Sequence, residues 1–210
     1  MTANLVALLA LIMAGGMGSR MISNEEKPML TVKNKPMVSY VLDTLKNSKC
    51  FEKIISLVSN TTPKTAQFLA KNNVQVANSS GKDYVKDLNY ALELVKPNKV
   101  FIISSDLPLI DSNTVKKIVS SFDRCKKPCL TVVVSKALLD DLGVSTDYCI
   151  EHDGKIVCHT GVSIIDSSQV SGQSKIDEEL LLMDKLQLAL NVNTMKELKL
   201  AEKMLTNPAF

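Results

Sequence analysis

The chain has 210 residues, a length that suits one domain with a buried core. Hydrophobic residues make up 45% of the sequence and charged residues 22%, a composition typical of folded rather than disordered chains. The formal net charge is +3, and Arg20 and Arg124 are the only arginines, so the sequence lacks the clustered cations of a dedicated nucleic-acid binder. Aromatic residues make up 4% with no tryptophan, which argues against a base-stacking platform for single strands.

Short apolar runs alternate with amphipathic stretches, the rhythm of strand–helix–strand units. This pattern predicts strands at 8–13, 53–58, 74–77, 100–104 and 130–134, and helices at 37–46, 63–71, 84–95 and 113–122. From residue 148 onward it predicts a hairpin turning at Asp153-Gly154, strands at 162–165 and 187–192, and a terminal helix at 195–205 opened by a capping box from Thr194 to Glu197. We therefore expect one Rossmann-like α/β domain over residues 1–210. Its sheet should be mixed but mostly parallel, with helices on both faces and a β-hairpin in the C-terminal third.

The cysteines predict a reduced, cytoplasmic protein, because their number is odd and their spacings fit no disulfide framework (Cys50, Cys125, Cys129, Cys149 and Cys158). The hairpin turn would place Cys149 opposite Cys158, with His152 on the other face of the ribbon. A zinc site there is one reading of these residue types, and half-buried strand thiols are the alternative. The apolar start, 5–13, does not read as a signal segment, because no positive charge precedes it and no convincing cleavage site follows it. No apolar run reaches the ~18 residues of a membrane span.

The most informative stretch is Leu11-Ile-Met-Ala-Gly-Gly-Met-Gly-Ser-Arg-Met21, followed by Glu26-Lys27-Pro28. A strand leads directly into a loop with glycines at 15, 16 and 18, in which backbone N–H groups can converge on an anion. Arg20 and Lys27 bring two cations to the same place. The spacing matches neither the P-loop nor the Rossmann GxGxxG motif. Glycines that merely make a tight turn would leave the arginine and the Lys-Pro pair unexplained.

This stretch resembles the nucleotidyltransferase family built on [LIV]-x-x-A-G-G-x-G-x-R followed by K-P. Members include sugar-phosphate nucleotidyltransferases, the molybdenum-cofactor guanylyltransferase and a short archaeal branch that acts on a corrinoid. The chain is similar to the corrinoid branch from about Leu8 to Leu205, on the segments 60–65, 79–89, 103–107, 161–165, 177–179 and 191–194. It departs from the family at Met17, where a polar residue is usual, and at Asp83, where a glycine is expected. The hairpin cysteines match nothing in the family pattern.

The resemblance implies transfer of GMP from GTP to a phosphorylated corrinoid, with release of pyrophosphate and with Mg²⁺ as the cofactor. A phosphate monoester is already ionised near neutral pH, so the reaction needs no general base, and the chain has only two histidines. The alternatives are a molybdenum-cofactor guanylyltransferase, a small sugar-phosphate nucleotidyltransferase, or a nucleotide-binding regulator without catalysis. The presence of Arg20, Lys27 and Asp106 together argues against the regulator. We expect neither a nucleic acid nor a membrane as partner, and the oligomeric state is not readable from the sequence.

The expected catalytic residues are Arg20, Lys27 and Asp106. Asp106 is the candidate magnesium ligand because it follows a central strand, where open α/β sheets place their ligands, and because Mg²⁺ prefers oxygen donors. A helix cap is the alternative role, but Asp111 is better placed for it. By resemblance, Asn193 or Asp177 would supply a second ligand.

The expected nucleotide-binding residues follow from the loop and, by resemblance, from the segments after the next strands: Met13, Ala14, Gly15, Gly16, Gly18, Arg20, Lys27, Asn60, Gly81 and Lys82. Gly161 would face the corrinoid phosphate by resemblance, although a glycine at a hairpin exit reads equally well. Lys82 has an exposed loop lysine as its alternative reading. The alternative reading of Asp87 and Asn89 is that they lie on the polar face of a helix. The alternative reading of Asn193 is a turn residue before the terminal helix.

Overall fold

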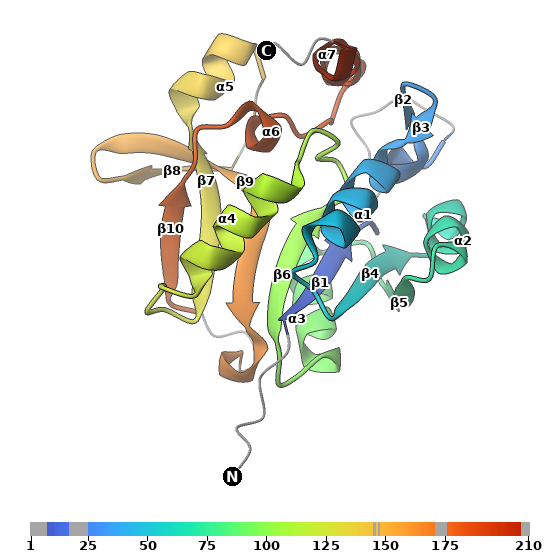
Figure 1. Ribbon diagram of the computed structural model, residues 1–210, viewed down its shortest axis with the longest axis horizontal. Helices are drawn as coiled ribbons and strands as arrows, with labels where there is room; N and C mark the ends of the chain where they lie inside the picture. Colours follow the sequence, from blue (N-terminus) through green and yellow to red (C-terminus); the bar gives the residue numbers. More distant parts are fainter. Residues whose placement is uncertain (1–7, 17–24, 145, 147, 171–175, 207–210) are drawn as a thin grey trace.

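The computed structural model describes residues 8–16, 25–144, 146, 148–170 and 176–206. In these ranges the chain forms an eight-stranded mixed sheet (Figure 1). Its strands are β1 (Leu8–Met13), β4 (Lys53–Ser59), β5 (Gln75–Ser79), β6 (Lys99–Ser104), β7 (Cys129–Ser135), β8 (Cys149–His152), β9 (Lys155–Asp166) and β10 (Glu178–Leu182). They lie in the order β10-β7-β9-β6-β1-β4-β5, and β8 pairs with β9 outside that path.

The first half of the sheet is parallel. β1 pairs in parallel with β4 and β6, and β4 pairs in parallel with β5. Along β1, Ala10 and Ile12 belong to the core on one face, whereas Leu9 and Leu11 belong to the core on the other. Burial on both faces explains why β1 is a continuous apolar run in the sequence. The carboxyl ends of all four strands meet at one edge of the sheet, where ligands of open α/β sheets bind.

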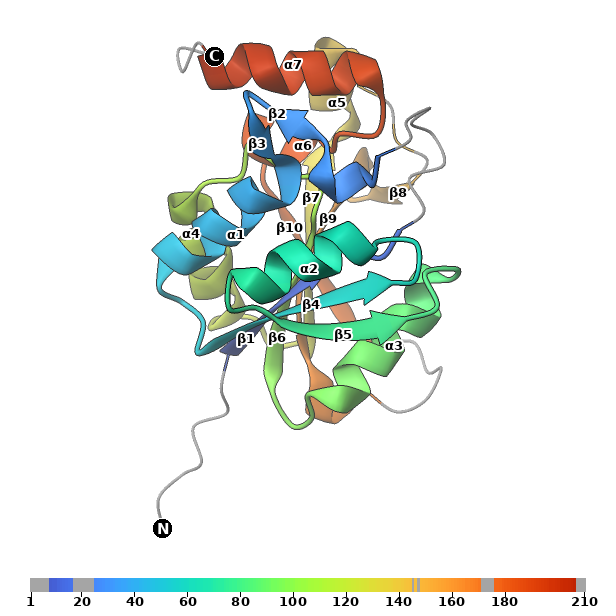
Figure 2. The ribbon, with the colours of Figure 1, turned by 90° about the vertical axis from the view of Figure 1, so that its right-hand side faces the viewer.

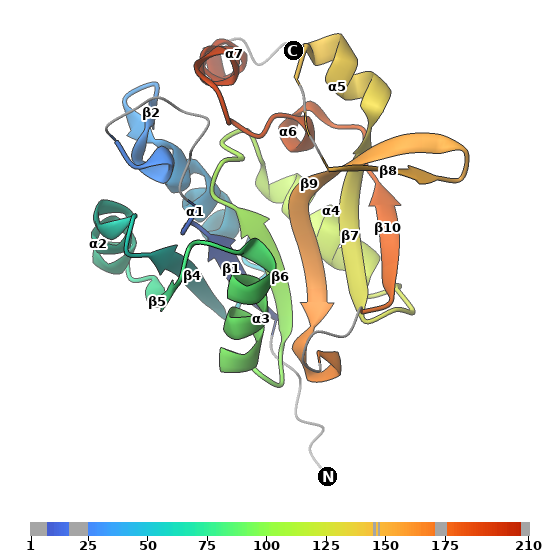
Figure 3. The same ribbon diagram turned by 180° about the vertical axis from the view of Figure 1, so that it is seen from behind.

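Helices cover both faces of this half, as expected. α1 (Met37–Ser48), α2 (Pro63–Lys71) and α4 (Ser112–Phe122) lie on one face, and α3 (Tyr84–Leu94) lies on the other (Figure 2 and Figure 3). The buried positions of α1 recur at helical spacing, so its apolar stripe faces the core. None of the described helices is long and apolar enough to cross a membrane.

In the second half of the sheet the long strand β9 pairs antiparallel with β6, β7 and β8, whereas β10 pairs in parallel with β7. The predicted hairpin is confirmed: Cys149 lies opposite Cys158 and His152 opposite Lys155. Asp153 and Gly154 have φ values of 48° and 70°, as a two-residue hairpin turn requires. β9 continues without a break from this hairpin to Asp166, so the strand expected at 162–165 is its second half.

The strand expected at 187–192 is wrong. Residues Leu186–Ala189 form the short helix α6, which leads through an irregular segment into α7 (Met195–Thr206). Leu188, Ala189, Leu190 and Val192 are buried in the core on one face of the sheet, so this run is apolar because it packs against that core and not because it pairs as a strand. Neither β10 nor helix α5 (Lys136–Leu142) was predicted.

The cysteine prediction is also wrong in part. Cys149 and Cys158 form a disulfide between β8 and β9, whereas Cys50, Cys125 and Cys129 are free thiols. The hairpin register brings the two sulfur atoms together on one face of the ribbon. An odd number of cysteines argues against a full set of disulfides and gives no indication of this single one. The disulfide uses both thiols that a zinc site in the hairpin would need.

Candidate active site

A pocket of about 280 Å³ opens at the carboxyl edge of the parallel strands. Met13, Leu57, Ser79 and Ser104 line it at or near the ends of β1, β4, β5 and β6. Its other lining residues come from the glycine loop, the start of α3 and the C-terminal part of the chain: Gly15, Gly16, Lys27, Pro28, Gly81, Lys82, Tyr84, Asp87, Ser105, Asp106 and Asn193. The pocket therefore collects most of the described residues that the sequence singled out.

The described part of the glycine loop packs closely against β4. The backbone N–H of Ala14 donates to the carbonyl of Leu57 at 2.8 Å, and the Ser59 hydroxyl donates to the Gly15 carbonyl at 2.8 Å. A Cβ on Gly15 would lie 3.0 Å from the backbone carbon of Val58, a contact tight enough that this position favours glycine. Ala14 is buried beneath the pocket rather than lining it. Met17, Gly18 and Arg20 lie outside the described residues.

The loop after β5 closes onto the glycine loop at Gly81. Gly81 has a φ of +68°, and a Cβ there would lie 2.7 Å from both the Gly15 carbonyl oxygen and the Ser59 Cβ. Asp87 of α3 fixes this loop by accepting hydrogen bonds from the backbone and the hydroxyl of Ser80, at 3.1 and 2.9 Å. Asp87 is therefore a buried structural carboxylate and not part of an exposed polar face.

Tyr84 is a pocket residue that the sequence did not single out. It lies at the first position of α3, and 55% of its surface is exposed. Burial around its hydroxyl, together with the negative charge of Asp106, raises the pKa of Tyr84 to about 12. Tyr84 therefore presents a neutral phenol to the pocket at physiological pH. Only its position just after Gly81 and Lys82 could have indicated this role.

Lys27 enters the pocket from η1 (Lys27–Met29), a short 3-10 helix. The residue before it, Glu26, anchors this segment to the start of α2. Its carboxylate accepts from the backbone N–H groups of Lys64 and Thr65, both at 2.7 Å, and from the Thr65 hydroxyl at 2.6 Å. A carboxylate is stabilised at a helix N-terminus by the free N–H groups and the helix dipole. The Glu26-Lys27-Pro28 sequence thus couples an anchor to the lysine that it positions.

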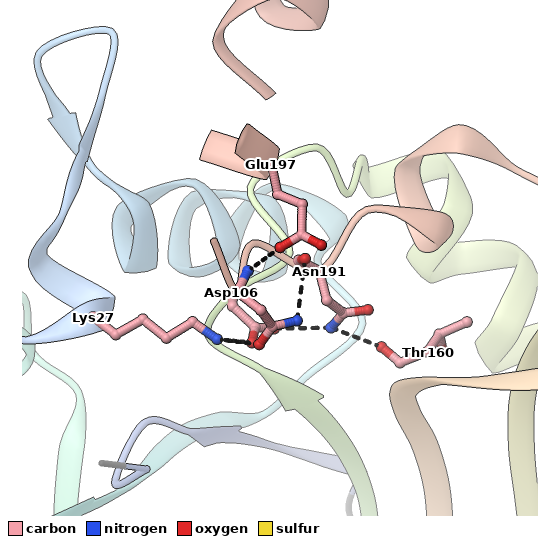
Figure 4. Close-up of polar contacts among 6 residues, drawn as sticks. Lys27, Asp106, Thr160, Asn191 and Glu197 are labelled. Carbon is pink, nitrogen blue, oxygen red and sulfur yellow. Dashed lines mark hydrogen bonds and ion pairs between the residues drawn. The ribbon is translucent and has the colours of Figure 1, made fainter. Parts of the chain in front are cut away.

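Lys27, Asp106 and Asn193 meet in the pocket, and Figure 4 shows the contact of Lys27 with Asp106. The Lys27 ammonium lies 2.5 Å from Asp106 Oδ2 and donates to Asn193 Oδ1 at 2.8 Å. Burial alone would raise the pKa of Asp106. The charge and hydrogen bond of Lys27 and further hydrogen bonds outweigh burial, and the pKa lies below its ordinary value. Asp106 is therefore a carboxylate at neutral pH.

Asn191 is a second residue that the sequence did not single out by itself. Its amide nitrogen donates to Asp106 Oδ1 at 2.9 Å and to the Thr160 carbonyl at 3.2 Å (Figure 4). The backbone N–H of Val192 also donates to the Asp106 carbonyl, at 2.9 Å. These bonds orient Asp106 from the C-terminal segment. Its spacing from Asn193 was the available signal, because residues two apart in an extended segment point the same way.

The oxygen atoms of this cluster suit a magnesium ion. Asp106 Oδ2 and Asn193 Oδ1 already converge on one cation, the Lys27 ammonium, and both are the hard donors that Mg²⁺ prefers. The described residues contain no group of three or more His, Cys, Asp or Glu side chains that could hold a metal. A Mg²⁺ ion usually keeps several waters and is held by one or two protein oxygens together with substrate phosphates.

Three predicted residues lie elsewhere. Asp177 pairs with Lys127 at 2.9 Å and is not part of the pocket, so of the two expected second ligands only Asn193 lies beside Asp106. Asn60 is exposed in the turn after β4 and does not line the pocket. Gly161 also lies outside the lining, but it is adjacent: a Cβ there would lie 3.2 Å from the Ser104 Cβ and 3.6 Å from Asn191 Nδ2.

A glycine loop, a lysine and a buried carboxylate at the carboxyl edge of a mostly parallel sheet define a nucleotidyltransferase. The sequence model of the MobA-like NTP transferase domain family matches residues 10–147, and the chain belongs to this family. The adenosylcobinamide-phosphate guanylyltransferase of Methanocaldococcus jannaschii is 32% identical over 201 residues, which cover 93% of this chain and 96% of that protein. The bifunctional protein GlmU of Pseudothermotoga lettingae is 28% identical over 79% of this chain, which spans 35% of that longer protein.

Solved structures show the same fold. The CMP:2-keto-3-deoxy-manno-octonic acid synthetase, solved in complex with CTP, superposes with a TM-score of 0.70 at 11% identity, over 96% of this chain and 98% of that one. The 4-diphosphocytidyl-2C-methyl-D-erythritol synthase of Anaerococcus prevotii gives a TM-score of 0.67 at 12% identity, over 96% and 99%. These neighbours confirm the expected nucleotidyltransferase fold.

Glu197 is expected to position Asn193 for nucleotidyl transfer. It is buried, and its carboxylate accepts from the Asn193 backbone N–H at 2.6 Å, while its own N–H donates to the Thr194 hydroxyl at 3.2 Å. Glu197→Ala should lower kcat by about tenfold, because it frees the turn that presents the Asn193 amide. Glu197→Gln keeps an acceptor oxygen and should retain most of the activity, which steady-state kinetics would measure.

A carboxylate farther along the same helix provides the control. Glu202 accepts from the backbone of Lys33 at 3.4 Å, away from the pocket, so Glu202→Ala should leave kcat unchanged. Wild-type kcat in Glu197→Ala would show that this carboxylate does not position Asn193.

Proposed function

We propose that this protein transfers GMP from GTP to adenosylcobinamide phosphate, giving adenosylcobinamide-GDP and pyrophosphate, a step of cobalamin biosynthesis. The Lys27–Asp106–Asn193 cluster beside the glycine loop supports the transfer chemistry, because it brings a cation and an oxygen donor set to one wall of a pocket. The acceptor rests on the M. jannaschii relative, whose similarity extends over nearly the full length of both chains.

The reaction is a displacement at the α-phosphorus of GTP. An oxygen of the acceptor phosphate monoester forms the new P–O bond, and the bond between the α-phosphorus and the bridging oxygen breaks, so pyrophosphate leaves with the electron pair. Because the attacking phosphate is already ionised, the protein need not remove a proton. Its task is to hold two anions in line and to neutralise the charge that develops on the leaving group.

The described residues divide this task between them. Gly15, Gly16 and Gly81 form a side-chain-free wall on which the nucleotide can lie against the backbone. Lys27 contributes a positive charge for the phosphates, and Arg20 is proposed to contribute a second. Lys82 lines the same pocket and is proposed to contact the nucleotide. Gly161, next to Ser104 and Asn191, is proposed to leave room for the acceptor phosphate.

Asp106 and Asn193 are the residues proposed to hold Mg²⁺. The ion would lower the barrier by neutralising charge on the phosphate oxygens. Asn191 and Glu197 would keep the two ligands in place through the hydrogen bonds that they already make. Tyr84, neutral and at the pocket mouth, would border the nucleotide without adding negative charge to it.

A molybdenum-cofactor guanylyltransferase is the second candidate, because the matching family model is the MobA-like domain and that model does not select the acceptor. A small sugar-phosphate nucleotidyltransferase would use the same pocket chemistry. The match to the M. jannaschii relative favours the corrinoid over both, since it combines 32% identity with coverage of 96% of that protein, whereas the match to GlmU covers 35% of GlmU.

Incubation with Mg²⁺, GTP and each acceptor in turn tests the proposal. We expect pyrophosphate release and a guanylylated corrinoid, identified by mass spectrometry, only when adenosylcobinamide phosphate is present. Reactions without an acceptor or with EDTA are the controls. Transfer to molybdopterin or to a sugar phosphate, with none to the corrinoid, would replace this proposal by the corresponding alternative. CTP or ATP in place of GTP measures the preference for guanine.

The cytoplasmic location expected from the sequence stays a prediction, and the Cys149–Cys158 disulfide does not support the reduced state from which it was inferred. The proposed partners are small molecules, GTP and the phosphorylated corrinoid.

A further inference from the structure

The Lys27 ammonium is enclosed by groups from three distant parts of the chain. Lys27 comes from η1, Asp106 from the segment after β6, and Asn193 from the segment before α7. Side-chain exposure is only 15% for Lys27 and 12% for Asp106, and the two residues are 79 positions apart in sequence. Tertiary packing therefore builds this cation position, in contrast to the exposed pairs formed between neighbouring turns of a helix.

The oxygens that hold the ammonium are the same ones that the proposed magnesium ion needs. Asp106 Oδ1 is engaged by the Asn191 amide, so Oδ2 is the carboxylate oxygen that faces the pocket cation. Asn193 Oδ1 also accepts from Lys27, at 2.8 Å. An ammonium and a divalent cation cannot share these two oxygens, because they would occupy one position and their like charges repel.

We infer that Lys27 is a tethered cation that occupies the divalent-metal position in the nucleotide-free protein and leaves it when the triphosphate binds. The inference rests on the proposed function, since it takes the metal ligands from there. Lys27 lines the nucleotide pocket, so the phosphates of a bound nucleotide compete with Asp106 for its charge. Withdrawal of Lys27 then frees Asp106 Oδ2 and Asn193 Oδ1 together.

This exchange has two consequences for the reaction. Without nucleotide, Asp106 stays neutralised by Lys27, and the pocket binds divalent metal poorly. With nucleotide, the same lysine moves from the carboxylate to the phosphates, so the affinities for nucleotide and metal rise together. Such coupling is reciprocal, because each ligand changes the affinity for the other by the same factor.

Mn²⁺ binding to the nucleotide-free protein tests the inference, with free Mn²⁺ followed by electron paramagnetic resonance. The wild-type protein should bind Mn²⁺ weakly, and Lys27→Met should bind it about tenfold or more tightly, because the carboxylate loses its resident cation. Lys27→Arg restores a cation and should bind as weakly as the wild type. Lys27→Met/Asp106→Asn should lose the gain.

Substitution of a second lysine of the same pocket shows whether Mn²⁺ binding depends on the cation that contacts Asp106 or only on the total charge of the pocket. Lys82→Met removes the same charge from the pocket lining, but Lys82 is not an ion-pair partner of Asp106, and the variant should change Mn²⁺ affinity less than threefold. Equal gains in Lys82→Met and Lys27→Met, or tight binding by the wild type, would overturn the inference.

Melting curves of each variant verify folding. Since no turnover is measured, failure here leaves the proposed guanylyl transfer intact, and failure of the transfer assay does not alter the Mn²⁺ result.

Discussion

Asp106→Asn is expected to lower the rate of guanylyl transfer by on the order of 10³-fold while the protein stays folded. The amide has the shape of the carboxylate but lacks its charge, so it can neither hold a divalent cation firmly nor balance Lys27. Loss of the 2.5 Å contact to Lys27 should also lower the free energy of unfolding by about 1–3 kcal/mol. Single-turnover kinetics with saturating GTP and thermal denaturation measure the two effects.

Asp177→Asn is the matched control, because Asp177 is the other carboxylate that the sequence offered as a ligand. Its partner is Lys127, and its side chain is 72% exposed, so the change should alter neither rate nor stability appreciably. A wild-type rate in Asp106→Asn would remove Asp106 from the proposed metal site. A large loss in Asp177→Asn would instead reassign the ligand.

Gly81→Ala is expected to weaken GTP binding by on the order of 10–100-fold, measured as Kd by calorimetry. The new methyl group would lie 2.7 Å from the Gly15 carbonyl oxygen and from the Ser59 Cβ, so the two loops that line the pocket must separate. The backbone conformation itself adds a cost of about 1–2 kcal/mol for a non-glycine residue at positive φ.

Gly154→Ala is the control that carries the cost of a positive φ without the close Cβ contact made at Gly81. Gly154 has a φ of +70°, close to the +68° of Gly81, but nothing lies within 4 Å of its added Cβ. It should therefore lose a similar amount of stability from strain and keep wild-type affinity for GTP. Unchanged GTP binding in Gly81→Ala would mean that the close approach of the two loops does not shape the nucleotide site.

Much of the fold could be predicted from local sequence. The buried strand 8–13, the helix 63–71 and the hairpin turn at Asp153-Gly154 agree with β1, α2 and the β8–β9 turn, because each depends on a contiguous pattern of burial or on turn chemistry. The prediction failed at 187–192, where a buried apolar run packs in the core as a short helix and an irregular segment and not as a strand. Periodicity describes how a segment is buried and leaves open which neighbour it pairs with.

The candidate site shows the same division. The glycine loop, Lys27 and Asp106 could be singled out because a strand end followed by glycines or a carboxylate is a local signal, and the resemblance added Asn193. The choice of Asn193 over Asp177 required the tertiary structure, which places one beside Asp106 and the other beside Lys127. Asn191 was missed because its role consists of hydrogen bonds to other segments, and Glu197 was expected only as part of a capping box and not as a partner of Asn193.

The sequence by itself determined the chemistry that this protein can offer: a side-chain-free loop after β1, a lysine ahead of a proline, and a carboxylate at a strand end. Only the tertiary structure decided that the lysine ammonium lies against this carboxylate. It also decided that two of the five cysteines form a disulfide. The physical reason is the distance along the chain over which each kind of interaction acts. Turn and strand preferences act over a few residues, whereas the distance between Lys27 and Asp106 depends on how η1, β6 and the segment before α7 pack together.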